Sequence, residues 1–227
     1  MSPHPNRPRN DAGRVRRVAV ALVVVLVVGA GLLVAGAASP SGASTAKKSG
    51  VATAPFTTPS GVALAETPPP WRLPVDAKPY IAAAGLSVLS AEQLEVHYHA
   101  HLDIIADNKK VTVPAGIGFV VENGRATGIT VLHTHDTSGI VHIESATDDV
   151  FTLGQLFTEW GVALNTNQVG GLEVDDTHVL QAYVNGRRLK GDPATIRLKP
   201  HLEIALWYGP AGTKAKVPKS YRFPEGL

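Results

Sequence analysis

The chain has 227 residues, no cysteine and a formal net charge of +2 at pH 7. Without cysteine it can form no disulfide, thiolate zinc site, iron–sulfur cluster or thiolate copper site. Five of its 21 basic residues and one of its 19 acidic residues precede residue 18, which leaves 16 basic and 18 acidic residues beyond. This balance excludes the basic surface that nucleic-acid binding requires.

A basic tail, residues 1–17, precedes an apolar segment, Val18–Ala38, of 21 residues. About 20 helical residues span the hydrocarbon core of a bilayer. By the positive-inside rule, the tail is predicted to be cytoplasmic and the rest of the chain to lie outside a single-pass anchor. A cleaved signal peptide is the alternative, because Ala35-Gly36-Ala37 resembles a cleavage site, although signal cores are usually shorter. Cleavage would make the protein secreted.

A linker is predicted next, over residues 39–75. It is rich in proline, serine, threonine and alanine and lacks an apolar period, so we expect a flexible stalk. Residues 76–227 are then predicted to form one extracytoplasmic domain that is rich in histidine. Its length of about 150 residues suits a single domain.

The first strand of this domain is predicted at Val96–Ala106, where polar and apolar residues alternate. Side chains at alternate positions of a strand share a face. One face is therefore predicted to carry His97, His99, His101 and Asp103. A turn at Asp107-Asn108 leads into a return strand, and Asn123-Gly124 is a further hairpin candidate.

A helix is predicted after several more strands. Its apolar residues recur at helical spacing: Leu153, Leu156, Phe157 and Trp160. Thr152 with Gln155 fits a capping box, and Gly161 fits a C-terminal stop.

Strand patterns return after this helix, with an Asn185-Gly186 hairpin signal and an alternating segment at 202–208. The order of strands, one helix and more strands predicts an α+β fold, a mainly antiparallel β-sheet with one packed helix. A β-grasp-like arrangement would suit this order. A small all-β sandwich or barrel with one helical insert is the alternative.

Two short segments contain six of the nine histidines: EVHYHAHLD at Glu95–Asp103 and VLHTHDTSGIVHIE at Val131–Glu144. Imidazole is the commonest metal ligand in proteins. The candidate metal ligands are His97, His99, His101, His133, His135 and His142. Three histidines at alternate positions span about 13 Å of strand, so we expect two of them to join His133 and His135 at one ion, with His142 close.

Carboxylates flank both segments. Asp103, Asp136 and Glu144 are predicted to orient the imidazoles by hydrogen bonds or to serve as alternative ligands. Nitrogen and oxygen ligands without sulfur suit Cu(II) and Zn(II) first, and also Ni(II) or non-haem iron. A polar hydrogen-bond network and a pH switch are the interpretations that need no metal.

The leading functional hypothesis is a membrane-anchored extracytoplasmic protein that captures or buffers Cu(II) or Zn(II). A metal-dependent hydrolase or oxidase is the first alternative, with Glu144 or Asp136 as general base. An interaction domain with a structural metal is the second alternative. The sequence names no protein partner.

The motifs also resemble a family of uncharacterised prokaryotic extracytoplasmic or membrane-anchored proteins rich in histidine. The resemblance covers Val96–Tyr208 and rests on four motifs: HxHxHL at His97–Leu102, VPAGIG at Val113–Gly118, LHTHDxSGxxHxES at Leu132–Ser145 and FTLGxxFxxWG at Phe151–Gly161. It implies an extracytoplasmic location and supports grouping the histidines, but it implies no reaction.

Two metalloprotein families fit less well. A cupin places a glutamate close after its H-x-H pair, whereas Glu144 lies nine residues after His135. Lysostaphin-like peptidases combine H-x-x-x-D with a later H-x-H. His99 with Asp103, and His133 with His135, imitate that pattern at a separation that is too short.

Overall fold

Strand β1 (Val96–Ala106) is the central strand of the structure, a computed structural model that describes residues 61–227. The predicted basic tail and the membrane segment Val18–Ala38 lie outside the described residues. Within residues 61–227, no helix is both long and apolar enough to span a bilayer.

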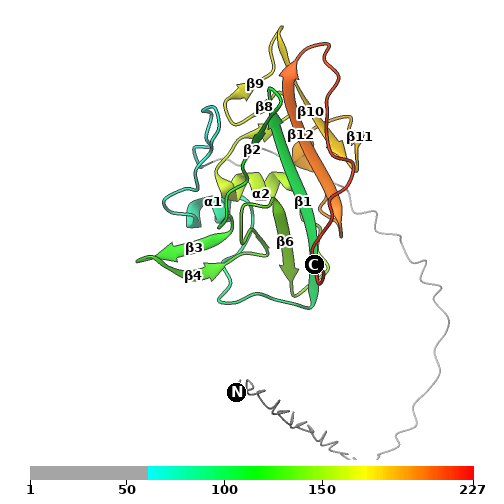
Figure 1. The fold of residues 1–227 in the computed structure, drawn as a ribbon. Helices are drawn as coiled ribbons and strands as arrows, with labels where there is room; N and C mark the ends of the chain where they lie inside the picture. Colours follow the sequence, from blue (N-terminus) through cyan, green and yellow to red (C-terminus); the bar gives the residue numbers. More distant parts are fainter. Residues whose placement is uncertain (1–60) are drawn as a thin grey trace, which may run out of the picture. The chain divides into compact units, whose positions relative to one another are not determined.

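A seven-stranded sheet surrounds β1, in the order β11-β10-β12-β1-β6-β5, with β2 also paired to β1 (Figure 1). The other strands of this sheet are β2 (Lys109–Val111), β5 (Leu132–His133), β6 (Ile140–Ser145), β10 (His178–Val184), β11 (Arg187–Arg188) and β12 (Leu202–Pro210).

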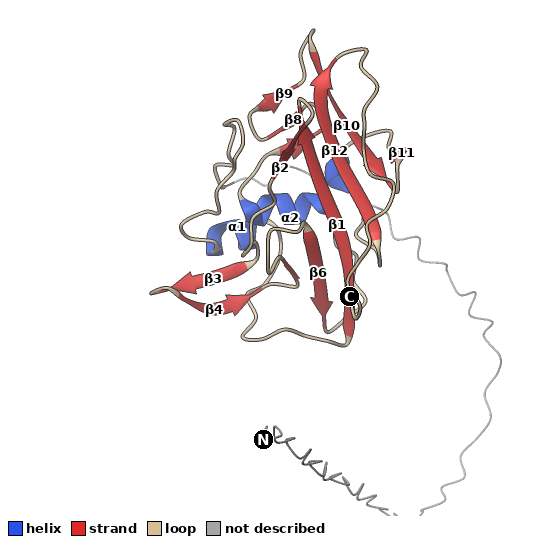
Figure 2. Cartoon of the chain, viewed as in Figure 1, coloured by secondary structure: helices blue, strands red, loops and turns tan. Residues whose placement is uncertain are grey.

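Two small sheets and three helical elements complete the described part (Figure 2). The small sheets are formed by β3 (Phe119–Glu122) with β4 (Arg125–Ile129), and by β7 (Leu164–Asn165), β8 (Gln168–Val169) and β9 (Leu172–Glu173). The helical elements are α1 (Lys78–Ala83), α2 (Leu153–Trp160) and a 3₁₀ turn, η1 (Pro193–Thr195).

Residues 61–227 are mostly sheet with two α-helices, which agrees with the predicted class in this coarse sense. The main sheet is mixed, however, because β1 pairs in parallel with β12 and antiparallel with β6. A parallel pair requires a crossover connection, and the chain between β1 and β12 supplies it. The β-grasp-like arrangement stays a prediction.

Tight turns connect the hairpins where the sequence predicts them. Both residues of Asp107-Asn108, Asn123-Gly124 and Asn185-Gly186 have positive φ. Two successive residues with positive φ are the signature of the type I′ turn, whose twist matches that of paired strands. These three dipeptides therefore set the registers of β1 with β2, β3 with β4 and β10 with β11.

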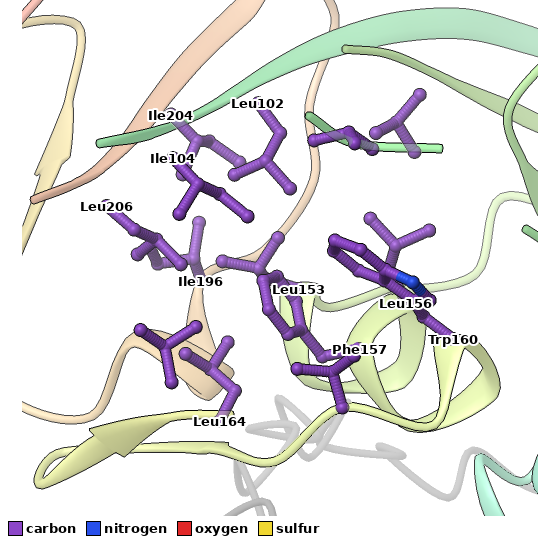
Figure 3. Close-up of a cluster of buried hydrophobic side chains, with 14 of the residues drawn as sticks. Leu102, Ile104, Leu153, Leu156, Phe157, Trp160, Leu164, Ile196, Ile204 and Leu206 are labelled. Atoms are coloured by element: carbon purple, nitrogen blue, oxygen red, sulfur yellow. The ribbon is translucent and has the colours of Figure 1, made fainter. Parts of the chain in front are cut away.

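The core lies between one face of the main sheet and α2 (Figure 3). Thr152 and Gln155 form the predicted capping box, and Gly161 ends the helix with φ of 76°. The buried face of α2 contributes Leu153, Leu156, Phe157 and Trp160, which meet Leu102 and Ile104 of β1 and Ile204 and Leu206 of β12. The predicted helix and its core face are confirmed.

Packing begins before residue 76, the predicted start of the domain. Trp71 is buried against Trp160, with ring centroids 5.7 Å apart, and Ala65 forms an isolated bridge with Val162. The structure also contains α1, whereas the sequence predicts only α2. Helix α1 has only six residues, too few to show an apolar period.

Candidate metal centre

The register of three neighbouring strands places histidines in one row across the sheet. His99 on β1 pairs with His142 on β6, and His142 pairs with His133 on β5. Two residues along the same β1–β6 ladder, His97 pairs with Glu144. Since side chains at alternate positions share a face, these four imidazoles and one carboxylate project from the face opposite the α2 core.

Four ligand atoms form a closed ring at one end of this row. Nε2 of His97 lies 3.2 Å from Nε2 of His99, which lies 3.1 Å from Nδ1 of His142. Oε1 of Glu144 closes the ring, at 3.3 Å from Nδ1 of His142 and 3.3 Å from Nε2 of His97. All four atoms therefore surround one point.

These spacings match those of atoms that share one metal ion. A transition metal binds imidazole nitrogen at about 2.0–2.1 Å, so two ligands at the tetrahedral angle lie about 3.3 Å apart. Hydrogen bonds alone cannot satisfy this ring, because each nitrogen has either one proton or one lone pair and yet takes part in two contacts. A single cation would satisfy all four atoms together.

A second group of donors meets the same row from the other side. Nε2 of His133 lies 3.2 Å from Nε2 of His135. Oε2 of Glu144 is 3.8 Å from Nε2 of His133. Oε1 of Glu92, in the segment before β1, is 3.4 Å from Nε2 of His135 and 3.9 Å from Nε2 of His133. Of these donors, His133, His135 and Glu144, together with His142, lie close enough to hold a metal ion.

The cluster is buried at its centre and open at its edges. His99 and His133 are 3% and 0% exposed. By contrast, the side chains of His97 and His135 are 38% and 43% exposed. An ion could therefore reach the cluster from solvent past the two outer imidazoles.

Burial keeps the central imidazoles unprotonated. It lowers the pKa of His99 to about 4 and that of His142 to about 3, and the nearby imidazoles add to both effects. Burial also lowers the pKa of His133 to about 4, although a hydrogen bond to the carbonyl of Thr130 opposes it. At pH 7 these rings are neutral, which is the form that binds metal.

The carboxylate of Glu144 is short of partners. Burial raises the pKa of Glu144 and the nearby Glu92 raises it further, whereas His135 lowers it. Its Oε2 atom has no hydrogen-bond partner among the described residues. A buried carboxylate oxygen usually has a partner, and a bound cation would supply it.

Backbone contacts fix the orientation of His133. Its Nδ1 lies 3.0 Å from the carbonyl oxygen of Thr130, so Nδ1–H donates and the Nε2 lone pair points into the cluster. The hydroxyl of Thr130 also meets the fully buried Glu159, whose pKa burial raises well above its usual value. Gly118 allows this packing, because a Cβ there would clash with the carbonyl of Leu132.

His101 does not join the cluster, although it shares a strand face with His97 and His99. Its Nδ1 lies 2.8 Å from Oε2 of Glu203 on β12, and its Nε2 lies 3.0 Å from the carbonyl oxygen of Ser138. Tyr221 stacks on the ring, with centroids 3.6 Å apart. The three groups His101, Asp103 and Glu203 are close enough to hold an ion, but both ring nitrogens already face oxygen atoms.

The two predicted aspartates also lie outside the cluster. Asp103 forms an ion pair with Lys110 at 2.7 Å. Asp136 accepts a hydrogen bond from the backbone N–H of Ser138, and hydrogen bonds with Ser138 lower its pKa. The structure thus brings together five of the six predicted histidines with Glu144.

The sequence gives little indication of the roles of Glu92 and Glu203. Glu92 shares its segment with a second acid, Glu95, and Glu203 lies 102 residues after its partner His101. Only the polar position of Glu203 in an apolar strand hinted that it needed a buried partner.

Residues 61–227 therefore form a mostly β-sheet domain with two α-helices and a histidine–glutamate cluster that could hold a metal ion. No protein-family model, characterised protein or solved structure matches this chain. The function therefore has to be inferred from the site itself.

Proposed function

We propose that this chain is a membrane-anchored extracytoplasmic protein that binds a divalent transition metal, Cu(II) or Zn(II), and captures or buffers it. The observation that carries the proposal is the closed ring formed by His97, His99, His142 and Glu144, with neighbouring ligand atoms 3.1–3.3 Å apart. Imidazole and carboxylate donors without sulfur suit these two ions.

The position of the cluster supports an exchangeable metal over a structural one. The cluster lies on the sheet face opposite α2, and the apolar core is assembled without it. His97 and His135 remain partly exposed at its edges. A site that solvent can reach suits capture and release, whereas structural zinc sites are closed.

The location outside a membrane rests on the sequence. The apolar segment Val18–Ala38 and the arginines before it favour an anchor with the domain outside. We also propose, on the motif at Leu132–Ser145, that the chain belongs with the extracytoplasmic histidine-rich proteins that it resembles.

The test is elemental analysis of the tag-free full chain after loading with Zn(II) or Cu(II) and removal of free metal. We expect at least one tightly held equivalent, and much less metal in a His99→Ala, His142→Ala double variant. A chain that retains no metal after either loading would refute the proposal and favour a polar hydrogen-bond network.

A metal-dependent hydrolase or oxidase is the second candidate function. The partial exposure of His97 and His135 favours it, because an ion that solvent can reach can also bind a substrate. The metal-loaded chain would then hydrolyse a generic ester or phosphoester faster than the metal-free chain, whereas equal rates would exclude that hydrolysis.

A further inference from the structure

Two overlapping sets of donors occupy the cluster. One set is His97, His99, His142 and Glu144, and the other is His133, His135, His142 and Glu144. Each of the two carboxylate oxygens of Glu144 faces one of these sets. Oε1 lies 3.3 Å from Nε2 of His97, whereas Oε2 lies 3.8 Å from Nε2 of His133.

We propose that the cluster holds two metal ions, bridged by the carboxylate of Glu144. This inference rests on the proposed metal-binding function and adds its stoichiometry. The first ion takes His97, His99, His142 and Oε1 of Glu144. The second ion takes His133, His135 and Oε2 of Glu144 from the second set. Oε1 of Glu92, which lies 3.4 Å from Nε2 of His135, takes the place of His142, whose Nδ1 serves the first ion.

The number of donors supports two ions. A zinc site normally has four ligands, and the five imidazoles with two glutamates exceed what one such ion can use. In known two-metal sites the ions lie about 3.5–4 Å apart, and a carboxylate can bind one ion through each oxygen. Glu144 is placed for that role, because its Oε2 has no hydrogen-bond partner among residues 61–227.

Charge also favours Glu92 as a ligand of the second ion. Two divalent ions bring four positive charges, and Glu144 alone supplies one negative charge. Glu92 is 3.4 Å from His135 and 3.9 Å from His133, so its carboxylate adds a second negative charge where the second ion would sit. Opposite charge close by lowers the cost of placing two cations together.

The two positions differ in their access to solvent. In the first set, only the His97 side chain is substantially exposed, at 38%. Around the second proposed position, the side chains of both His135 and Glu92 are 43% exposed. Exposed donors are held less firmly, so the second ion binds more weakly and exchanges faster than the first.

The experiment is a Cu(II) titration of the tag-free full chain, followed by electron paramagnetic resonance and by metal analysis. We expect two equivalents. The first gives the signal of an isolated Cu(II) ion, and the second broadens or removes that signal, because two Cu(II) ions about 4 Å apart couple magnetically. This titration uses the unchanged chain, so misfolding of a variant cannot affect its result.

Variants then assign the two positions. His97→Ala with His99→Ala, and separately His133→Ala with His135→Ala, should each reduce the stoichiometry from two ions to one. His178→Ala is the control, because His178 contacts Asp107 and Asp175 and belongs to neither donor set, and it should retain two ions.

The possible outcomes distinguish a failure of the two-ion inference from a failure of the proposed metal-binding function. One equivalent at saturation would overturn the two-ion site and leave the metal-binding proposal standing. Two equivalents with independent, uncoupled signals would overturn the Glu144 bridge. No bound metal would overturn the proposed function itself.

Discussion

The two ends of one face of β1 use the same residue type in opposite ways. At the first end, His97 and His99 direct ring nitrogens toward each other, and His99 also meets the nitrogen of His142. Two residues further along, His101 directs both nitrogens toward oxygen atoms. The partners of a histidine therefore decide its role, even within a regular H-x-H-x-H motif.

The C-terminal segment accounts for part of this difference. Tyr221 stacks on His101, and Glu203 meets it from β12, so that end of the face is closed. At the other end His97 remains 38% exposed. One face thus has a closed end, where His101 and Glu203 pair within the protein, and an open end, where the donors could hold a cation.

The strongest test of the comparison removes two nitrogens from the open end. His99→Ala with His142→Ala removes two of the three imidazoles that surround the first ion. We expect the affinity for that ion to fall by at least about 100-fold, because even outer-shell partners contribute about 10–100-fold. Competition with a chelator of known affinity measures this. An unchanged affinity would mean that the metal binds elsewhere.

Substitution at the closed end should lower the stability of the fold and leave metal affinity unchanged. His101→Ala leaves Glu203 and Asp103 buried without their imidazole partner. Removing one partner of a buried pair costs about 3 kcal/mol, which lowers Tm by roughly 10 °C for a domain of this size. Thermal unfolding of the metal-free protein measures it.

The same variant provides a control for metal binding. Because the nitrogens of His101 face Glu203 and Ser138, its removal should leave the metal stoichiometry unchanged. A loss of bound metal from folded His101→Ala protein would show that the two ends act as one site.

Lower pH should destabilise the metal-free protein through the buried histidines of the cluster. The unfolded chain protonates histidine near the ordinary pKa of 6.5, whereas His99, His133 and His142 in the fold do so near 4, 4 and 3. Between these values the unfolded state binds more protons, so these groups lower the stability of the metal-free protein as pH falls from about 6.5 to 4.

Burial raises the pKa of Glu144 and Glu203. Protonation of these two carboxylates therefore favours the folded state as pH falls, which opposes the effect of the histidines. The difference between variants isolates the histidines. Unfolding of metal-free His99→Ala, His142→Ala protein should depend less on pH in this window than unfolding of the unchanged chain. Equal pH dependence in the two proteins would contradict the lowered pKa of these imidazoles.

The smallest expected effect concerns the rim of the open end. Glu92 is 43% exposed and contacts His135 and His133, so Glu92→Ala should weaken the second metal equivalent by about tenfold and leave the first unchanged. Glu95→Ala serves as the matched control from the same segment. Calorimetric titration with Zn(II) distinguishes the two steps, and an equal loss at both steps would remove Glu92 from the second position.

Much of the local structure follows from sequence patterns. The alternation in Val96–Ala106 predicts which side chains share each face of β1, and the turn dipeptides predict the hairpins. The spacing from Leu153 to Trp160 predicts α2 together with its caps. These features depend on contacts between residues that are close in the chain, so local preferences suffice to predict them.

The grouping of the histidines could be predicted only in part. The density of histidine in two segments indicates a cluster, and five of the six candidates meet. The position of His101 could not be predicted, because it depends on the parallel pairing of β1 with β12, which sets Glu203 directly beside it. Glu92 likewise reaches the cluster through the path of the chain before β1.

By itself, the sequence determined the strand faces, the hairpin turns, the capped helix and the presence of a metal-type donor set. Only the tertiary structure decided which donors converge, because strand register across β1, β6 and β5 aligns His99, His142 and His133 in one row. Register and crossover join residues that are far apart in the chain. A one-residue shift in pairing would carry the imidazoles to the other face, which is why local patterns name the ligand types and the folded sheet selects the ligands.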